Sequence, residues 1–162
     1  MEIIIGFSRS KHWYKVGSKL IQLSEKTNFS HVYLRIQDNL TDEPMVYQAS
    51  LGSVNTQHFD VFKENNIVVE EVKLYVTVEQ FHTILKFLQQ NMGKKYSKLQ
   101  IAILTVMKLL GRKTPIFTYD NDEFICSELG YNVLQLLGLY PKENVDYKTP
   151  SDVRRELQKL GR

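Results

Sequence analysis

The chain has few of the sequence features that would indicate the class of protein directly, such as cysteines, a large net charge or a long apolar run at its start. It contains one cysteine in 162 residues, so no internal disulfide can form and the cysteine content does not indicate an oxidising compartment. Its formal net charge is only +3, with acidic and basic residues interspersed, which gives no support to nucleic-acid binding. Its first residues hold an apolar run that is too short for the core of a signal peptide.

The sequence also lacks a hydrophobic run that is long enough to cross a membrane. The longest apolar stretch, Ile101–Leu110, is interrupted by Thr105 and Lys108. There is no composition shift, low-complexity linker or internal repeat, and 162 residues suit a single hydrophobic core. We therefore expect one soluble domain over residues 1–162, cytoplasmic or encoded by a phage or virus, with no transmembrane segment and no nucleic-acid partner.

Hydrophobic patterns predict strands in the first half of the chain. Between His31 and Ile36, apolar and polar residues alternate, which is typical of a half-buried strand. Apolar and β-branched runs predict further strands at residues 3–7, 45–50, 67–69 and 72–76. Turn-forming residues over 38–44 separate two of these strands.

Apolar residues spaced three and four apart predict helices around these strands. The first covers about 14–26, and the residues expected on its buried face are Val16, Leu20 and Leu23. The next begins at Thr77, which has capping-box spacing to Gln80, and stops at Gly93. The remaining helices are expected over 101–110, over 126–137 and from Pro150 on, the last capped by Ser151. Strands in one half with helices around them indicate an α+β fold.

The segment with the clearest chemistry surrounds the lone thiol. Residues 122–129 place Cys126 at the first turn of an amphipathic helix, where unpaired N–H groups and the helix dipole favour an anion. We therefore expect a lowered thiol pKa and a reactive, partly exposed nucleophile. The alternative is that Cys126 is a buried packing residue, as free cysteines often are. Glu128 is expected to stabilise the helix start through the dipole, and Asp122 and Glu123 to be solvated loop charges.

His31 is the histidine best placed to act as a base. It stands where a turn passes into the predicted strand, on the face opposite Val32, from which it can approach a helix N-terminus packed against the sheet. The alternative is a strand-end histidine bonded to backbone. The other histidines look like surface or boundary residues and show no metal-ligand spacing with Cys126, so we expect neither a zinc site nor a cofactor.

Two further segments resemble a known family. Gly93-Lys-Lys-Tyr96 and Phe124-Ile-Cys126-Ser-Glu-Leu129 look like the Gly-x-x-Tyr and Cys-Ser segments of NlpC-type papain-like hydrolases. In ordinary members the histidine follows the cysteine, whereas Phe29-Ser-His-Val-Tyr33 precedes it here. That order resembles the circularly permuted branch, the YaeF/YiiX-like amidases, which are distantly similar to the lecithin:retinol acyltransferase group.

The resemblance implies a permuted papain-like fold, with an antiparallel sheet packed against helices and the nucleophile at a helix N-terminus. Cys126 would attack a carbonyl carbon, and His31 would take the thiol proton. The backbone N–H of Cys126 would be an oxyanion donor. Tyr96 matches the family's tyrosine beside the thiol, although ordinary aromatic packing is an equal alternative.

The third catalytic residue is expected from the strand that follows the histidine. Relatives often have Glu at this place, and this sequence has Gln48, which offers a hydrogen bond but no charge. If His31 pairs directly with Gln48, Leu34 faces Met45, and His31 and Gln48 share one face of the sheet. A slip by one residue would separate them.

Three functions remain open from the sequence. The first is an amidase or peptidase, perhaps acting on cell-wall peptides, and the second is a lipid-directed thiol acyltransferase or esterase that acts on a lipid-linked substrate. The apolar segment 101–110 favours the second if it is an exposed lid or lipid-contacting element rather than core. The third is a non-catalytic binding module on the same scaffold, which Gln48 in place of a carboxylate would suit.

Overall fold

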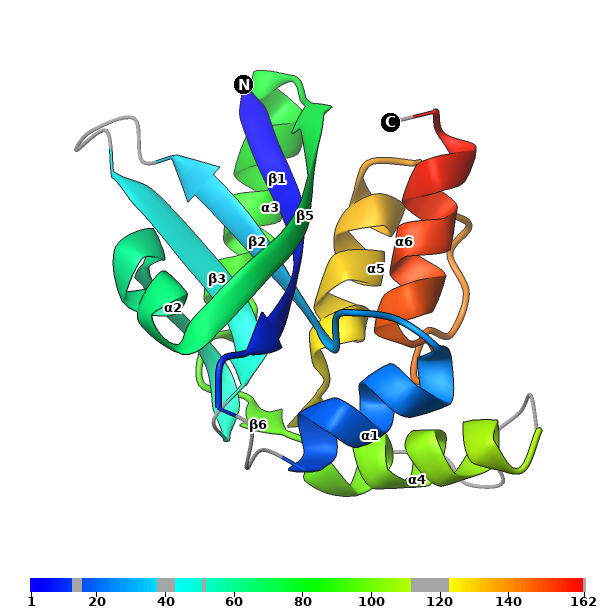
Figure 1. Cartoon of the computed structure of the whole chain (residues 1–162). Coiled ribbons are helices and arrows are strands. Elements are labelled where there is room, and N and C mark those ends of the chain that lie inside the picture. The colour runs from blue at the N-terminus through cyan, green and yellow to red at the C-terminus, as the bar shows by residue number, and fades with distance from the viewer. Residues whose placement is uncertain (13–15, 38–42, 51, 112–122, 162) are drawn as a thin grey trace.

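The computed structural model describes residues 1–12, 16–37, 43–50, 52–111 and 123–161 (Figure 1). The strands are β1 (Glu2–Ser10), β2 (His31–Gln37), β3 (Pro44–Ser50), β4 (Ser53–His58), β5 (Asn66–Tyr75), β6 (Lys95–Tyr96) and β7 (Glu123–Phe124). The helices are α1 (Val16–Glu25), α2 (Phe59–Asn65), α3 (Val78–Asn91), α4 (Lys98–Leu109), α5 (Cys126–Leu136) and α6 (Pro150–Lys159). The α+β class is therefore confirmed.

The strands form one curled sheet in the order β5-β1-β2-β3-β4-β6-β7 (Figure 1). The pairs from β5 to β6 are antiparallel, as the resemblance implied. The last pair is parallel, however: Lys95 pairs with Glu123 and Tyr96 with Phe124. The expectation of a purely antiparallel sheet is thus wrong at one edge, because β6 and β7 are two-residue strands that a sequence pattern does not reveal.

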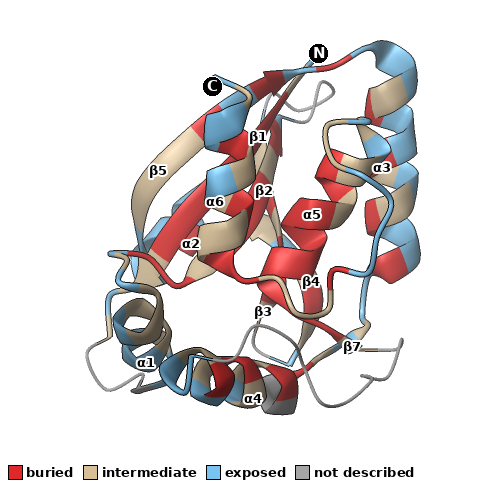
Figure 2. Ribbon diagram, turned by 90° about the vertical axis from the view of Figure 1, so that its right-hand side faces the viewer, coloured by how far each residue is buried: buried red, intermediate tan, exposed pale blue. Residues whose placement is uncertain are grey.

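Each face of the sheet packs against its own helices. Apolar residues of β1, β2, α3, α5 and α6 form the main core, and α5 is buried along most of its length (Figure 2). On the other face, the short helix α2 places Phe62 against Tyr33 and Val46 in a smaller cluster. Alternation along β2 therefore sends Val32 toward α5 and its neighbour His31 toward α2. The sequence predicted that the two side chains lie on opposite faces, but not that the helix facing His31 is α2.

The pairing of β2 with β3 differs by two residues from the expected register. Leu34 lies opposite Tyr47 rather than Met45, which faces Ile36. Because side chains alternate with a period of two, this shift leaves His31 and Gln48 on the same face, as diagonal rather than direct neighbours. The shared face is confirmed and the direct pairing is wrong.

Local signals located several elements correctly. Thr77 and Gln80 form the predicted capping box of α3, and Gly93 follows that helix with a φ of 80°. In α6 the N-cap is Thr149 rather than Ser151, and its backbone N–H donates to Asp152 at 3.0 Å. The two strands expected between residues 67 and 76 are a single strand, β5, and neither β4 nor α2 was predicted.

Helix α1 does not bury the face that its apolar spacing indicated. Leu20 is 43% exposed and Leu23 is 71% exposed. The helix instead packs against α4, where the carboxylate of Glu25 meets Lys108 at 3.1 Å. Some expectations fall outside the described residues: the first two residues of the predicted helix, the burial of Val16, most of the 38–44 turn, and Asp122. Within the described part of the chain, the structure has no helix that is both long and apolar enough to span a membrane.

Candidate functional site

Cys126 is the first residue of α5, as predicted. The helix start is stabilised by Glu128, whose carboxylate accepts a hydrogen bond from the backbone N–H of Ile125 at 2.9 Å and another from the amide of Gln100. A carboxylate at this place satisfies an N–H group that has no partner within the helix and complements the helix dipole. The expected role of Glu128 at the helix start is thus supported by its hydrogen bond from the backbone of Ile125.

The thiol itself is less activated than its position suggested. Cys126 is only 3% exposed, and burial raises its pKa to about 11. Hydrogen bonding from the backbone of Val32 and Ser127 lowers the pKa in part, whereas the carboxylates of Glu25 and Glu128 raise it. The expectation of a partly exposed, low-pKa thiol is therefore wrong for this state, because desolvation outweighs the helix N-terminus.

Glu128 gives a testable dependence of stability on pH. Burial raises the pKa of its carboxyl to about 7, against about 4.3 in an unfolded chain. The folded protein binds this proton more tightly than the unfolded chain does. The stability that Glu128 contributes through this proton is therefore fully present below about pH 4 and is lost as the pH rises through about 7. We expect the free energy of unfolding to fall by about 2–4 kcal/mol over this interval from this group alone. Urea unfolding of the wild type and Glu128→Gln measures the difference.

A matched control for that experiment is Glu79→Gln, which changes an exposed carboxylate in the first turn of α3. This control should retain the wild-type slope of stability against pH, and Glu128→Gln should flatten it. Equal slopes in all three proteins would mean that Glu128 titrates as an ordinary surface group.

His31 and Gln48 are brought together by the fold. Nε2 of His31 lies 2.8 Å from Oε1 of Gln48. The orientation of this amide is fixed by Asn55, whose Nδ2 donates to the carbonyl oxygens of Ser50 and Ser53, both at 2.9 Å, so that its Oδ1 faces Nε2 of Gln48 at 3.4 Å. An amide oxygen can only accept, so Nε2 of His31 carries the proton and Nδ1 is the basic nitrogen of the neutral ring.

Sequence reasoning missed Asn55. A signal for it exists in hindsight, since an Asn in the middle of a strand is unfavourable unless its side chain has a specific partner.

Strand β2 links this pair to the thiol. His31 is its first residue, and Val32, its second, hydrogen-bonds through its backbone to the sulfur of Cys126. The imidazole ring is half-buried and lies 6.4 Å from the ring of Phe62, measured between centroids. The fold therefore attaches the base and the thiol to adjacent residues of one strand, with the side chain of Val32 toward α5 and that of His31 toward α2.

Tyr96 lies close enough to Cys126 for the two groups to interact electrostatically. Burial, followed by the charge of a Cys126 thiolate, holds the pKa of the Tyr96 phenol well above its usual range. Its ring also packs beside Ala49, Val54 and Phe124. The structure supports the packing interpretation, since the aromatic ring fills a small core. The proposed role of Tyr96 beside the thiol stays a prediction.

Cys126 lines a narrow, partly open cleft with a volume of about 20 Å³. Its walls are formed by α1, by α4 and by the starts of α5 and α6, and they include apolar side chains of Ile21, Ile101 and Leu104. The predicted apolar helix therefore has a buried side, with Leu104 and Met107 each 8% exposed, that borders the thiol. The other side of this helix is exposed.

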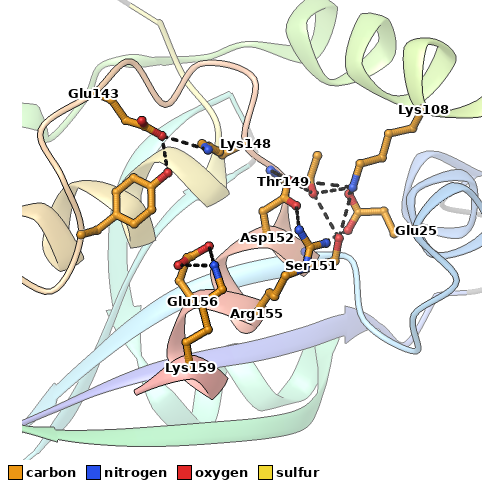
Figure 3. Close-up of polar contacts among 11 residues, drawn as sticks. Glu25, Lys108, Glu143, Lys148, Thr149, Ser151, Asp152, Arg155, Glu156 and Lys159 are labelled. Atoms are coloured by element: carbon orange, nitrogen blue, oxygen red, sulfur yellow. Dashed lines mark hydrogen bonds and ion pairs between the residues drawn. The ribbon is translucent and has the colours of Figure 1, made fainter. Parts of the chain in front are cut away.

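A polar network closes one side of the cleft (Figure 3). The Glu25 carboxylate, whose side chain is 2% exposed, pairs with Lys108 and accepts a hydrogen bond from the backbone N–H of Ser151 at 3.0 Å. Lys108 also donates to Thr149 at 2.7 Å. Glu25 and Lys108 were not among the predicted site residues, and the one sequence signal was a lysine inside the most apolar segment of the chain.

No family model matches the sequence, and no curated protein matches it significantly. Among solved structures, the chain is similar to the crystal structure described as metalloprotein yiiX from Escherichia coli O157:H7, with a TM-score of 0.57 and 23% identity. The match covers 98% of this chain and 79% of that one. At this identity the likeness shows the fold alone. The chain therefore has the fold of yiiX, and the YiiX-like resemblance in its motifs is confirmed at that level.

Proposed function

We propose that this protein is a cysteine hydrolase that cleaves an amide bond, with Cys126 as nucleophile and His31 as its base. The observation that carries the proposal is the position of the only thiol: it is the first residue of a buried helix, it lines a cleft, and it touches the strand that begins with His31. A buried thiol kept only for packing has no need to line a cleft.

The raised thiol pKa sets the order of the steps. Because the resting thiol is neutral, His31 takes its proton at Nδ1 as the sulfur bonds to the carbonyl carbon of the substrate. The backbone N–H of Cys126 is the oxyanion donor that we assign. The imidazolium then returns the proton to the leaving amine, and a water molecule deprotonated by His31 cleaves the thioester and restores the thiol.

In this scheme Gln48 orients the ring of His31. Tyr96 forms one wall of the place that the acyl group occupies next to the thiol. The contact from Gln48 Oε1 to His31 Nε2 fixes the tautomer that leaves Nδ1 basic. A neutral amide gives the imidazolium no opposite charge, so this site holds the proton less strongly than one with a carboxylate in that place.

A second candidate function, an esterase or acyltransferase acting on lipid-linked acyl groups, has one specific observation in its favour. The walls of the cleft beside Cys126 are apolar at Ile21, Ile101 and Leu104. An acyl chain is a better match for such walls than the polar backbone of a peptide. The chemistry at the thiol is the same, and only the leaving group differs.

The description of yiiX as a metalloprotein raises the question of a metal here. Within the described residues, no three His, Cys, Asp or Glu side chains are grouped so that they could share a metal ion. The residues that line the cleft do not make a ligand set, and no step of the proposed mechanism passes through a metal.

The proposal is tested by hydrolysis of N-acyl p-nitroanilides and acyl p-nitrophenyl esters of increasing chain length. Turnover of anilides supports the amidase. Turnover confined to esters, with a rate that increases with chain length, supports the second candidate. The absence of thiol-dependent turnover of either series would favour the non-catalytic binding module.

Variants at Gln48 test the proposed role of this residue. Gln48→Glu places a negative charge beside the ring and should raise the His31 pKa, because a nearby opposite charge favours the imidazolium. Gln48→Ala should lower activity by about tenfold, since the ring is no longer held in one orientation. NMR titration of the His31 ring protons in the three proteins measures the pKa. An identical pKa in the wild type and Gln48→Glu would remove Gln48 from the site.

A further inference from the structure

Five exposed apolar residues lie on the neighbouring helices α1 and α4, and they are here called the α1–α4 face. Leu23 is 71% exposed, Leu110 69% and Leu109 57%. The other two members are Leu20 and Val106, which are 43% and 54% exposed. Soluble proteins seldom leave so many large apolar side chains together in water unless something covers them.

The two helices lie side by side at one end of the molecule (Figures 1 and 2). Their C-terminal ends are held together by the contact between Glu25 and Lys108 at 3.1 Å. Leu109 follows Lys108 directly and Leu23 lies two residues before Glu25, so these exposed leucines lie near the helix ends that the ion pair joins.

The exposed charges described on these two helices have one sign. Among residues 17–26 and 100–111, whose exposure the structure describes, the exposed charged residues are Lys19 and Lys26. Glu25 is turned inward, where it pairs with Lys108. A second copy of the chain docked through this face would bring lysines against lysines, whereas an anionic lipid surface offers both hydrocarbon for the leucines and negative charge for the lysines.

We propose that the α1–α4 face docks the protein onto an anionic lipid surface. The inner sides of the same two helices line the cleft at Cys126, so docking places this cleft beside the bilayer. The inference does not rest on the reaction proposed for the thiol: the face would bind lipid equally well if the cleft only held a ligand.

The test is sedimentation with vesicles of phosphatidylcholine, alone or mixed with phosphatidylglycerol. We expect binding to the mixed vesicles, weakened about tenfold or more by raised salt or by omission of phosphatidylglycerol. The double variant Leu23→Glu/Leu109→Glu should lose binding by at least about tenfold, and Lys19→Glu/Lys26→Glu should lose it at low salt.

Two controls make the test specific. Tyr75→Glu/Val78→Glu changes apolar residues that are 81% and 57% exposed at the β5–α3 junction, at the opposite end of the molecule, and should bind as the wild type does (Figure 1). Cys126→Ala should also bind normally, which separates docking from catalysis.

Failure of the wild type to bind either vesicle would overturn the proposal, as would retained binding by a folded Leu23→Glu/Leu109→Glu protein. Self-association without lipid binding, abolished by the same leucine changes, would assign the face to a second copy instead.

Discussion

Replacement of Cys126 by alanine is expected to lower hydrolysis by about a thousandfold or more while the protein remains folded. The change removes the atom that forms the bond to the substrate, so the oriented His31 has no proton to take. The lost sulfur leaves a small space beside Val32 in the core, which should cost about 1 kcal/mol. Initial rates with the best p-nitrophenyl ester or anilide, compared with thermal melts of both proteins, measure the two effects.

Ser24→Ala is a suitable control for this substitution. Ser24 lines the same cleft, and its hydroxyl donates to the backbone carbonyl of Ile21 at 3.0 Å. This variant should keep its activity within about twofold, since it removes only one contact within α1. If Cys126→Ala keeps its activity, or loses it together with a collapse of the melting temperature, Cys126 is a structural residue of the core.

Gly6→Ala is expected to destabilise the protein by about 3 kcal/mol or more. A Cβ at this position would lie 2.1 Å from Cζ of Tyr33, inside the ring. The ring is fully buried, donates its hydroxyl to Glu71 at 2.8 Å and packs on Phe62 with centroids 4.6 Å apart, so it cannot move aside without breaking these contacts. For a protein of this size, the melting temperature should fall by about 6–12 °C.

Gly17→Ala is the matched control, because an added Cβ there meets nothing within 4 Å and the residue lies in α1. It should leave the protein as stable as the wild type or slightly more stable, since alanine favours helix. A Gly6→Ala protein that melts at the wild-type temperature would contradict the pairing of Gly6 with Tyr33, and with it the strand register that places His31.

The sequence was most informative where the deciding contacts are local. The capping box of Thr77 and Gln80 spans one turn, and the helix that starts at Cys126 follows from the spacing of its own apolar residues. The strand period of two allowed His31 and Gln48 to share a face if the register was right, but it does not distinguish registers that differ by two residues. For this reason His31 and Gln48 are in contact even though the pairing of β2 with β3 differs from the expected one.

Features that depend on contacts between residues far apart in the sequence could not be predicted from it. The thiol pKa is governed by burial and by Glu25, which lies about a hundred residues earlier in the chain. The apolar spacing of α1 predicted a buried stripe, yet the partner of this helix is α4, and the contact that joins them at one end is the ion pair of Glu25 with Lys108. A hydrophobic pattern records which side of a helix is apolar and not what covers that side.

The reaction of the thiol with an acyl donor tests the central claim most directly. Wild-type protein mixed with p-nitrophenyl butyrate and quenched in acid should show one butyryl group by intact-protein mass spectrometry, located on Cys126 by peptide mapping. His31→Ala should acquire this group at least about a hundredfold more slowly, because the neutral thiol then has no base. Equal rates of acylation in the two proteins, or butyryl groups on lysines alone, would contradict the assignment of Cys126 and His31 as a catalytic pair.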